Sequence, residues 1–316
     1  MFALRGIAVS FSVFVLVYCA LSLAVCVTWR SFWHHLQHHP ARRIADLLFA
    51  LRLFPLASAA IITAVFTIPS FVLLEPRSID EPVGEIPLLL GFCGAALVIF
   101  GVVNAALAMR RASRTITQWT RQAQPMAASA PVPVLRIART VPAMIAAGIA
   151  RPKVLVSGAA EFLLSEHELQ TALNHEVAHV RRHDNLKKLL LRFVTFPGMT
   201  SLQAAWLEAS EMAADDAAVA SAGEALDLAA ALIKLSRLGP VECPIDLTAA
   251  LVHSPASVVN ARVERLIAWS EECRVPQQRS SPWLGVCAAL ATVAAFAITY
   301  SQLLIHVHTA TEWLVR

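Results

Sequence analysis

The sequence lacks a large net charge and any cysteine spacing that would organise a metal or disulfide framework. Its formal net charge is +4 over 316 residues and its arginines are scattered, so nothing indicates a nucleic-acid partner. None of the six cysteines forms a Cys-x-x-Cys pair, so neither a zinc ribbon nor a disulfide scaffold is indicated. Most of them stand in apolar runs, where cysteine behaves as a small hydrophobic residue.

Apolar residues are in excess. They make up 57% of the chain and the mean hydropathy is +0.60, whereas about 45–50% is usual in soluble proteins. The apolar runs 6–29, 53–74, 86–109 and 283–307 are each long enough for a transmembrane helix, which needs about 20 residues. The first run could also be a signal peptide starting at Arg5, but no small-residue cleavage site stands out. We therefore expect a lipid bilayer as partner and four spans.

The charges of the loops predict the orientation of these spans. Segments 30–52 and 110–121 are rich in arginine, whereas the loop 75–85 is acidic, and positive loops stay on the cytoplasmic side. We expect a multi-pass protein of a bacterial-type inner (plasma) membrane with both termini external. Its domains would be a three-helix transmembrane region (1–109), a cytoplasmic domain (110–281), and the fourth helix with a short external tail (282–316).

A histidine cluster, HHLQHH, follows the first run at 34–39. His34 with His38, and His35 with His39, have the spacing of metal ligands on a helix. Two interpretations remain open. The cluster could hold a metal loosely, or the segment could be a solvated helix lying on lipid headgroups.

The soluble part should begin with a small sheet. Residues 132–138 and 153–157 predict short strands, with Gly148 and Pro152 as turn residues between them. Such a sheet could offer an edge to an extended substrate chain. The segment before it, 110–130, should be a polar linker. Helices are expected after the sheet at 201–222, 224–238 and 256–273, and the apolar stretch 189–199 is either a core helix or a segment on the inner leaflet.

A His-Glu-x-x-His pattern carries the chemistry. His175 and His179 are four residues apart, so on a helix they share one face and can reach one Zn²⁺. Glu176 is turned by about 100° and can polarise water without binding the metal. A helix start is predicted just before, because Ser165 and Glu168 form a Ser-x-x-Glu capping box.

A zinc hydrolase needs three protein ligands and an open position for water. Glu211 on a second helix can supply the third ligand. Asp215 lies one turn further on the same face and can accept a hydrogen bond from a ligand imidazole.

These segments resemble a known family. HEVAHVRRHD (175–184) and EMAADDAAV (211–219), with VPAMIAAGIARPKVLVS before and HSPASVVNARVERLI after, are similar to the membrane zinc peptidases of the beta-lactam sensor/antirepressor (BlaR/MecR-type) family. More distantly they resemble prenyl-protein and heat-shock membrane peptidases. The resemblance implies a mainly α membrane protein with four spans and a cytoplasmic α+β zincin (gluzincin) domain between the third and fourth. It also implies His175, His179 and Glu211 as zinc ligands and Glu176 as the base.

The expected reaction is attack of water on a peptide bond. Zn²⁺ would lower the pKa of its water and polarise the carbonyl, and Glu176 would carry the proton to the leaving amine. His253 and Arg262 are alternatives for stabilising the oxyanion, since both tyrosines lie in spans. His183 would continue the ligand face but lie too far along the helix. Asp184 would anchor the helix end without a catalytic role.

The leading functional hypothesis is a membrane-bound metalloendopeptidase that cleaves a cytoplasmic or membrane-proximal protein, such as a transcriptional repressor. The alternatives are a quality-control protease of membrane proteins and a signalling scaffold that zinc merely orders. The family's sensors carry a penicillin-binding domain after the fourth span, whereas this sequence ends at Arg316. We therefore expect any signal to arrive through the spans, the short loops or a membrane sensor partner.

Overall fold

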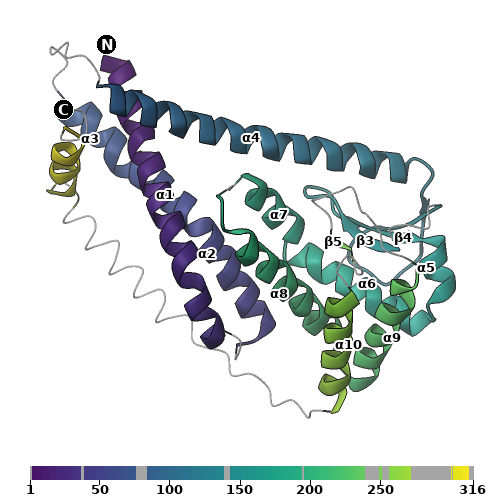
Figure 1. Ribbon diagram of the computed structural model, residues 1–316. Helices are drawn as coiled ribbons and strands as arrows, with labels where there is room; N and C mark the ends of the chain where they lie inside the picture. Colours follow the sequence, from purple (N-terminus) through teal and green to yellow (C-terminus); the bar gives the residue numbers. More distant parts are fainter. Residues whose placement is uncertain are drawn as a thin grey trace. The chain divides into compact units, whose positions relative to one another are not determined.

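The computed structural model describes residues 2–36, 39–75, 84–138, 143–193, 196–238, 249–250, 256–271, 300 and 302–312. The chain forms two compact units. The first comprises Met1–Thr28, Leu53–Phe100 and Arg274–Arg316, and the second comprises Trp29–Arg52 and Gly101–Cys273. The elements of both are labelled in Figure 1.

Three helical stretches are long and apolar enough to cross a membrane, among the residues that the structure describes: Phe2–Ser31, Ala41–Leu74 and Glu85–Thr120. The first lies in α1 (Phe2–Leu36) and the third is α4 (Glu85–Thr120). The second runs through α2 (Ala41–Ile62), the π-helical turn η1 (Thr63–Thr67) and α3 (Ile68–Leu74). Large apolar side chains on them face outward, such as Leu73 and Phe92 at 69% and 73% exposure. Such surfaces are suited to contact with lipid and indicate association with a membrane.

The helical stretches extend beyond the apolar runs, the second and third by the most. The second begins at Ala41 and not at residue 53, and the third continues past residue 109 to Thr120. The linker expected at 110–130 is therefore helical in its first half, because arginine is a good helix former and no glycine or proline interrupts 110–120. Of the fourth span expected at 283–307, only Tyr300 and 302–307 are described, and residues 302–312 are helical.

The second unit contains a five-stranded sheet with the order β1-β2-β4-β3-β5. Its central strands are β2 (Val134–Ile137), β4 (Lys153–Ser157) and β3 (Met144–Ala147). Strand β4 runs parallel to β2 and antiparallel to β3. The outer strands are β1 (Gln124–Pro125) and β5 (Ala249–Ala250).

The strands expected at 132–138 and 153–157 are confirmed as β2 and β4. The prediction missed β3, which lies in the segment between them and ends just before Gly148. This glycine has a φ of +92°, the left-handed conformation that a turn needs and that favours glycine.

Both faces of the sheet are covered, because alternate side chains of a strand point to opposite faces. Val154 and Val156 of β4 belong to a core with α6 (Glu166–Arg181) and α9 (Ala222–Ser236). Leu155 points the other way and packs in a cluster with Ala112 and Trp119 of α4. The polar end of α4 thus forms part of the second unit.

The remaining helices of this unit are α5 (Gly158–Leu163), α7 (Asp184–Phe193), α8 (Thr200–Ala218) and α10 (Ala256–Glu271). The prediction of one helix over 201–222 was wrong at its end. Helix α8 stops at Ala218, because Ser221 and Glu224 form a capping box that starts α9. In the 189–199 stretch, Leu191 is buried and Leu189 packs against the sheet cluster, which favours the core-helix interpretation.

Candidate metal centre

Helix α6 places two imidazoles side by side. It begins with the predicted capping box, in which the Glu168 N–H donates to Ser165 Oγ at 3.3 Å and the Ser165 N–H donates to Glu168 Oε2 at 2.8 Å. About two and a half turns beyond the start of α6, His175 is buried, and so is His179 one turn further on. Their Nε2 atoms lie 3.1 Å apart.

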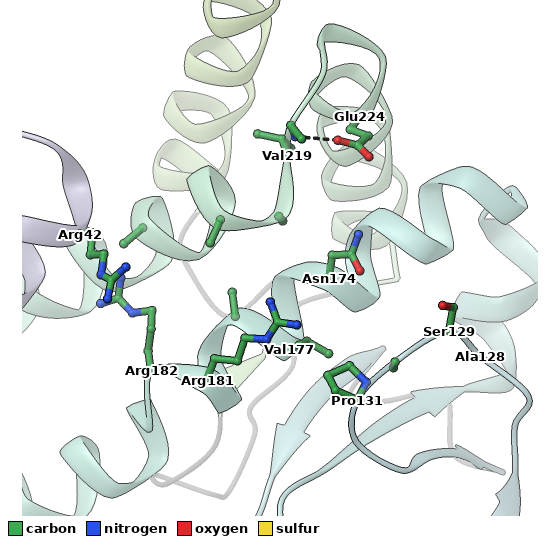
Figure 2. A pocket seen from close by; sticks show the side chains of 16 residues that line it. Arg42, Ala128, Ser129, Pro131, Asn174, Val177, Arg181, Arg182, Val219 and Glu224 are labelled. Atoms are coloured by element: carbon green, nitrogen blue, oxygen red, sulfur yellow. Dashed lines mark hydrogen bonds between the residues drawn. The ribbon is translucent and has the colours of Figure 1, made fainter. Parts of the chain in front are cut away.

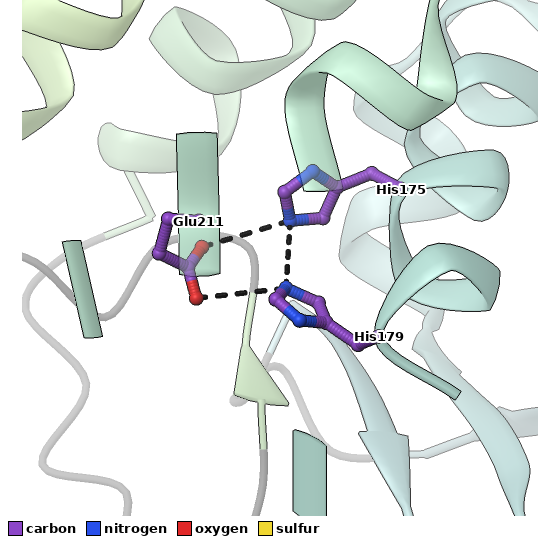
Figure 3. A group of neighbouring side chains, drawn as sticks. All are labelled: His175, His179 and Glu211. Carbon is purple, nitrogen blue, oxygen red and sulfur yellow. Dashed lines mark hydrogen bonds and ion pairs between the residues drawn. The ribbon is translucent and has the colours of Figure 1, made fainter. Parts of the chain in front are cut away.

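Helix α8 brings a carboxylate to the same point (Figure 3). Glu211 Oε2 lies 3.6 Å from His175 Nε2, and its Oε1 lies 3.5 Å from His179 Nε2. The three ligand atoms all lie within 4.8 Å of one another. Two atoms each about 2.0–2.1 Å from one tetrahedral Zn²⁺ would be about 3.3 Å apart. The observed separations and the donor set of two imidazoles and one carboxylate therefore fit such an ion.

Glu176 is buried beside these residues and faces strand β3. Its Oε2 accepts a hydrogen bond from the Ala146 N–H at 2.6 Å. Its Oε1 is buried and has no hydrogen-bond partner among the described residues. Burial raises the pKa of Glu176 above its ordinary value, and the nearby imidazoles and the Ala146 N–H only partly offset this. A carboxyl group with a raised pKa and one unused oxygen is suited to taking up and returning a proton.

The outward nitrogens of both imidazoles face carboxylates. His175 Nδ1 lies 2.9 Å from Asp215 Oδ1, and His179 Nδ1 lies 2.7 Å from Asp184 Oδ2. Ser210 also donates a hydrogen bond to Asp184 Oδ2, at 3.0 Å. A carboxylate at Nδ1 holds the proton there and leaves the Nε2 lone pair directed at the centre.

The structure thus brings Asp215 next to His175, and its role behind a metal ligand stays a prediction. Asp184 was expected only to anchor the helix end, and its contact with His179 was missed. The only available signal was its position five residues after His179, which does not show which way the side chain turns.

Arg262 of α10 lies behind the candidate ligands. Its Nε and Nη2 donate to Asp215 Oδ2 and Oδ1 at 2.8 and 2.6 Å, and its Nη1 lies 3.2 Å from Glu211 Oε2. Burial alone would raise the pKa of Asp215, but the Arg262 guanidinium and His175 hold it well below its ordinary range. The side chain is 1% exposed, so it is placed to orient Asp215 and Glu211, which argues against the alternative of contact with a substrate oxyanion.

Other predicted residues fall elsewhere. His183 does not continue the ligand face, because α6 ends at Arg181 and His183 adopts a φ of 55°. His253 lies outside the described residues. Residues 37 and 38 of the HHLQHH cluster lie outside them too, and His39 is the cluster's one histidine with a described side chain, which is exposed.

Two imidazoles and a carboxylate, with a second buried carboxyl group beside them, define a candidate metal centre of the kind that metallopeptidases use. A model of the BlaR1 peptidase M56 family matches residues 76–266, which include α6, α8 and most of α10. The match covers more than half of the chain, so the chain belongs to this family, as the sequence resemblance predicted. It is a membrane-associated metallopeptidase. A comparison with curated proteins finds no match.

Proposed function

We propose that the chain is a zinc endopeptidase in which His175, His179 and Glu211 hold the metal and Glu176 is the general base. The convergence of three ligand atoms within 4.8 Å carries this proposal. It is supported by Oε1 of Glu176, which is buried and has no hydrogen-bond partner in the part of the chain that the structure describes. A purely structural zinc site would not need this second carboxyl group.

The chain's own residues account for most of the chemistry. Zn²⁺, when bound, would act as a Lewis acid that polarises the scissile carbonyl and acidifies water. Asp215 and Asp184 keep the imidazoles of His175 and His179 in the tautomer that binds metal. Glu176 Oε1 takes the proton from the attacking water and delivers it to the leaving amine, while the Ala146 N–H fixes the position of the carboxyl group.

The sheet limits where an extended substrate can pair. At the centre of β3, the Ala146 N–H donates to Glu176 and the Ala146 carbonyl accepts from Asn185 Nδ2 at 3.0 Å. Strand β3 is also flanked by β4 and β5. On this side of the sheet, a substrate strand would therefore have to add beside β5 or displace it, rather than pair with Ala146.

The substrate class is protein, and a cytoplasmic or membrane-proximal protein such as a repressor is the leading candidate. The arginine-rich segments support an inner-membrane, multi-pass arrangement with the domain 110–281 in the cytoplasm. Quality control of membrane proteins stays the second candidate, because the same site would cut both kinds of substrate. A membrane sensor partner would supply the signal in the first case.

Metal content and cleavage test this proposal together. The purified full chain should hold about one Zn²⁺ by elemental analysis, and His175→Ala and Glu211→Ala should each lose zinc and proteolysis. His183→Asn is the matched control, since asparagine tolerates a positive φ and His183 has no place among the ligands. Full zinc retention in Glu211→Ala would remove Glu211 from the ligand set. Proteins that accumulate in cells carrying Glu176→Gln would identify the substrate.

A further inference from the structure

Helix α6 forms part of the wall of a cavity of about 830 Å³ (Figure 2). Asn174 and Ala178 line it from α6, and the end of α8, the loop 128–131 and the start of α9 complete its walls. His175 and His179 directly follow these two α6 residues in the chain but point to another face, because each residue turns the helix by about 100°. The cavity and the candidate metal centre thus share a helix without sharing side chains.

Three arginines line this cavity: Arg42, Arg181 and Arg182. The Arg182 side chain is only 10% exposed, and its Nε lies 3.5 Å from Asp184 Oδ1. Its two terminal nitrogens, Nη1 and Nη2, are buried and have no hydrogen-bond partner among the described residues. A buried cation with unpaired donors is unfavourable unless something accepts hydrogen bonds from it.

The carboxylates around the cavity offset only part of this charge. Glu224 lines it, but its Oε2 already accepts from the Ala220 and Ser221 N–H groups at the start of α9. Asp184 is shared with His179 and Ser210. Three guanidinium groups against two carboxylates leave an excess of positive charge at the cavity, and the buried Arg182 guanidinium in its wall has two donors without a partner among the described residues.

We propose that this cavity binds a phosphate-bearing anion, held by Arg182 with Arg42 and Arg181. A guanidinium presents paired N–H groups that match two phosphate oxygens, and several guanidinium groups can surround one phosphate. The same chemistry is offered by a phospholipid headgroup and by a soluble phosphate.

The position of Arg42 connects the cavity with a membrane surface. Arg42 is the second residue of the apolar stretch Ala41–Leu74. Basic residues at the end of such a helix lie at the level of anionic headgroups. Occupancy would tie α2 to α6 and α8, the helices that carry the candidate metal ligands, so the anion would stabilise this unit.

Thermal unfolding of the full chain tests the site. One arm adds inorganic phosphate to the protein in neutral detergent, against chloride at equal ionic strength. The other arm compares nanodiscs of phosphatidylcholine with and without phosphatidylglycerol. When the free anion concentration is about ten times its Kd, binding should raise Tm by roughly 3–6 °C. Arg42→Gln and Arg182→Gln should lose at least half of this rise.

Arg43→Gln is the matched control, because Arg43 is an exposed neighbour on α2 that does not line the cavity. It should keep the full shift. A shift in the phosphate arm identifies a soluble ligand, and a shift confined to phosphatidylglycerol identifies a lipid headgroup. Arg42→Gln keeps the proposal testable if Arg182→Gln does not fold, because Arg42 is exposed. No shift in either arm, or equal shifts in Arg42→Gln and Arg43→Gln, would overturn the proposal.

Discussion

Arg262 and Asp215 form a buried two-point ion pair, with donor–acceptor distances of 2.8 and 2.6 Å. Asp215 in turn lies 2.9 Å from His175 Nδ1. Arg262 of α10 therefore positions Asp215 of α8, and Asp215 in turn orients the candidate ligand His175 of α6. This chain of contacts links three helices that are far apart in the sequence.

Arg262→Gln should weaken both metal binding and folding. Loss of a partner behind a ligand lowers metal affinity by about 10–100-fold, and breaking a buried ion pair costs about 3–5 kcal/mol in unfolding free energy. Zinc titration and denaturant unfolding measure the two effects. The matched control is Arg265→Gln, whose partly exposed pair with Asp216 should contribute at most about 1 kcal/mol. Equal losses in both variants would remove the special role of Arg262.

Metal affinity should rise with pH. Burial lowers the pKa of His179, but the carboxylates of Glu211 and Asp184 outweigh it and raise this pKa to about 10 in the metal-free site. The metal binds only neutral imidazole, so at pH 7 it must displace a proton. Apparent zinc affinity should therefore increase by about tenfold per pH unit between pH 6 and 8. Titration against a chelator of known pH dependence checks this, and a flat profile would contradict it.

Acid should destabilise the domain in part through Glu168. Burial would raise the pKa of Glu168, but Lys234 and the Ser165 N–H outweigh it and lower this pKa. The carboxylate's contribution to folding stability is then fully present above the ordinary glutamate pKa. It is lost as the pH falls through the lower pKa that Glu168 has in the folded protein. Glu168→Gln should reduce Tm at pH 7, and the difference from wild type should shrink below about pH 4.5. A difference that stays constant down to pH 3 would assign the effect to packing alone.

The orientation of the spans can be tested independently of the chemistry. Reporter fusions at residue 80 and after residue 312 should report an external position, and a fusion near residue 125 should report a cytoplasmic one, because arginine-rich loops stay inside. A cytoplasmic signal at residue 80 would invert the arrangement and move the candidate metal centre to the outside.

Local patterns predicted what depends on near neighbours in the sequence. The capping box of Ser165 and Glu168, the strand at 153–157 and the shared face of His175 and His179 all follow from spacing along the chain. The sequence did not predict β3, because its short apolar run becomes a strand only by pairing with β4. The turn of His183 out of the helix was missed as well, because no glycine or proline marks it.

The partners of the candidate ligands were harder to predict. Arg262 reaches Asp215 across 47 positions, and its burial depends on how α10 packs. A single sequence contains the charge of each residue but not the tertiary contact that pairs them. The Asp184 contact with His179 was missed because it depends on the break between α6 and α7.

The most direct test of the account is Glu176→Gln in the purified, zinc-loaded full chain. Glutamine keeps the size of the side chain and can still accept from the Ala146 N–H, but it has no basic carboxylate. Zinc content and Tm should stay near wild type, because Glu176 is not among the proposed ligands. Cleavage of a co-expressed cytoplasmic substrate in liposomes should fall by about 10²–10⁴-fold, the usual contribution of a general base. Wild-type cleavage by Glu176→Gln, with unfolding of His175→Ala, would show that the metal is structural and would contradict the peptidase mechanism.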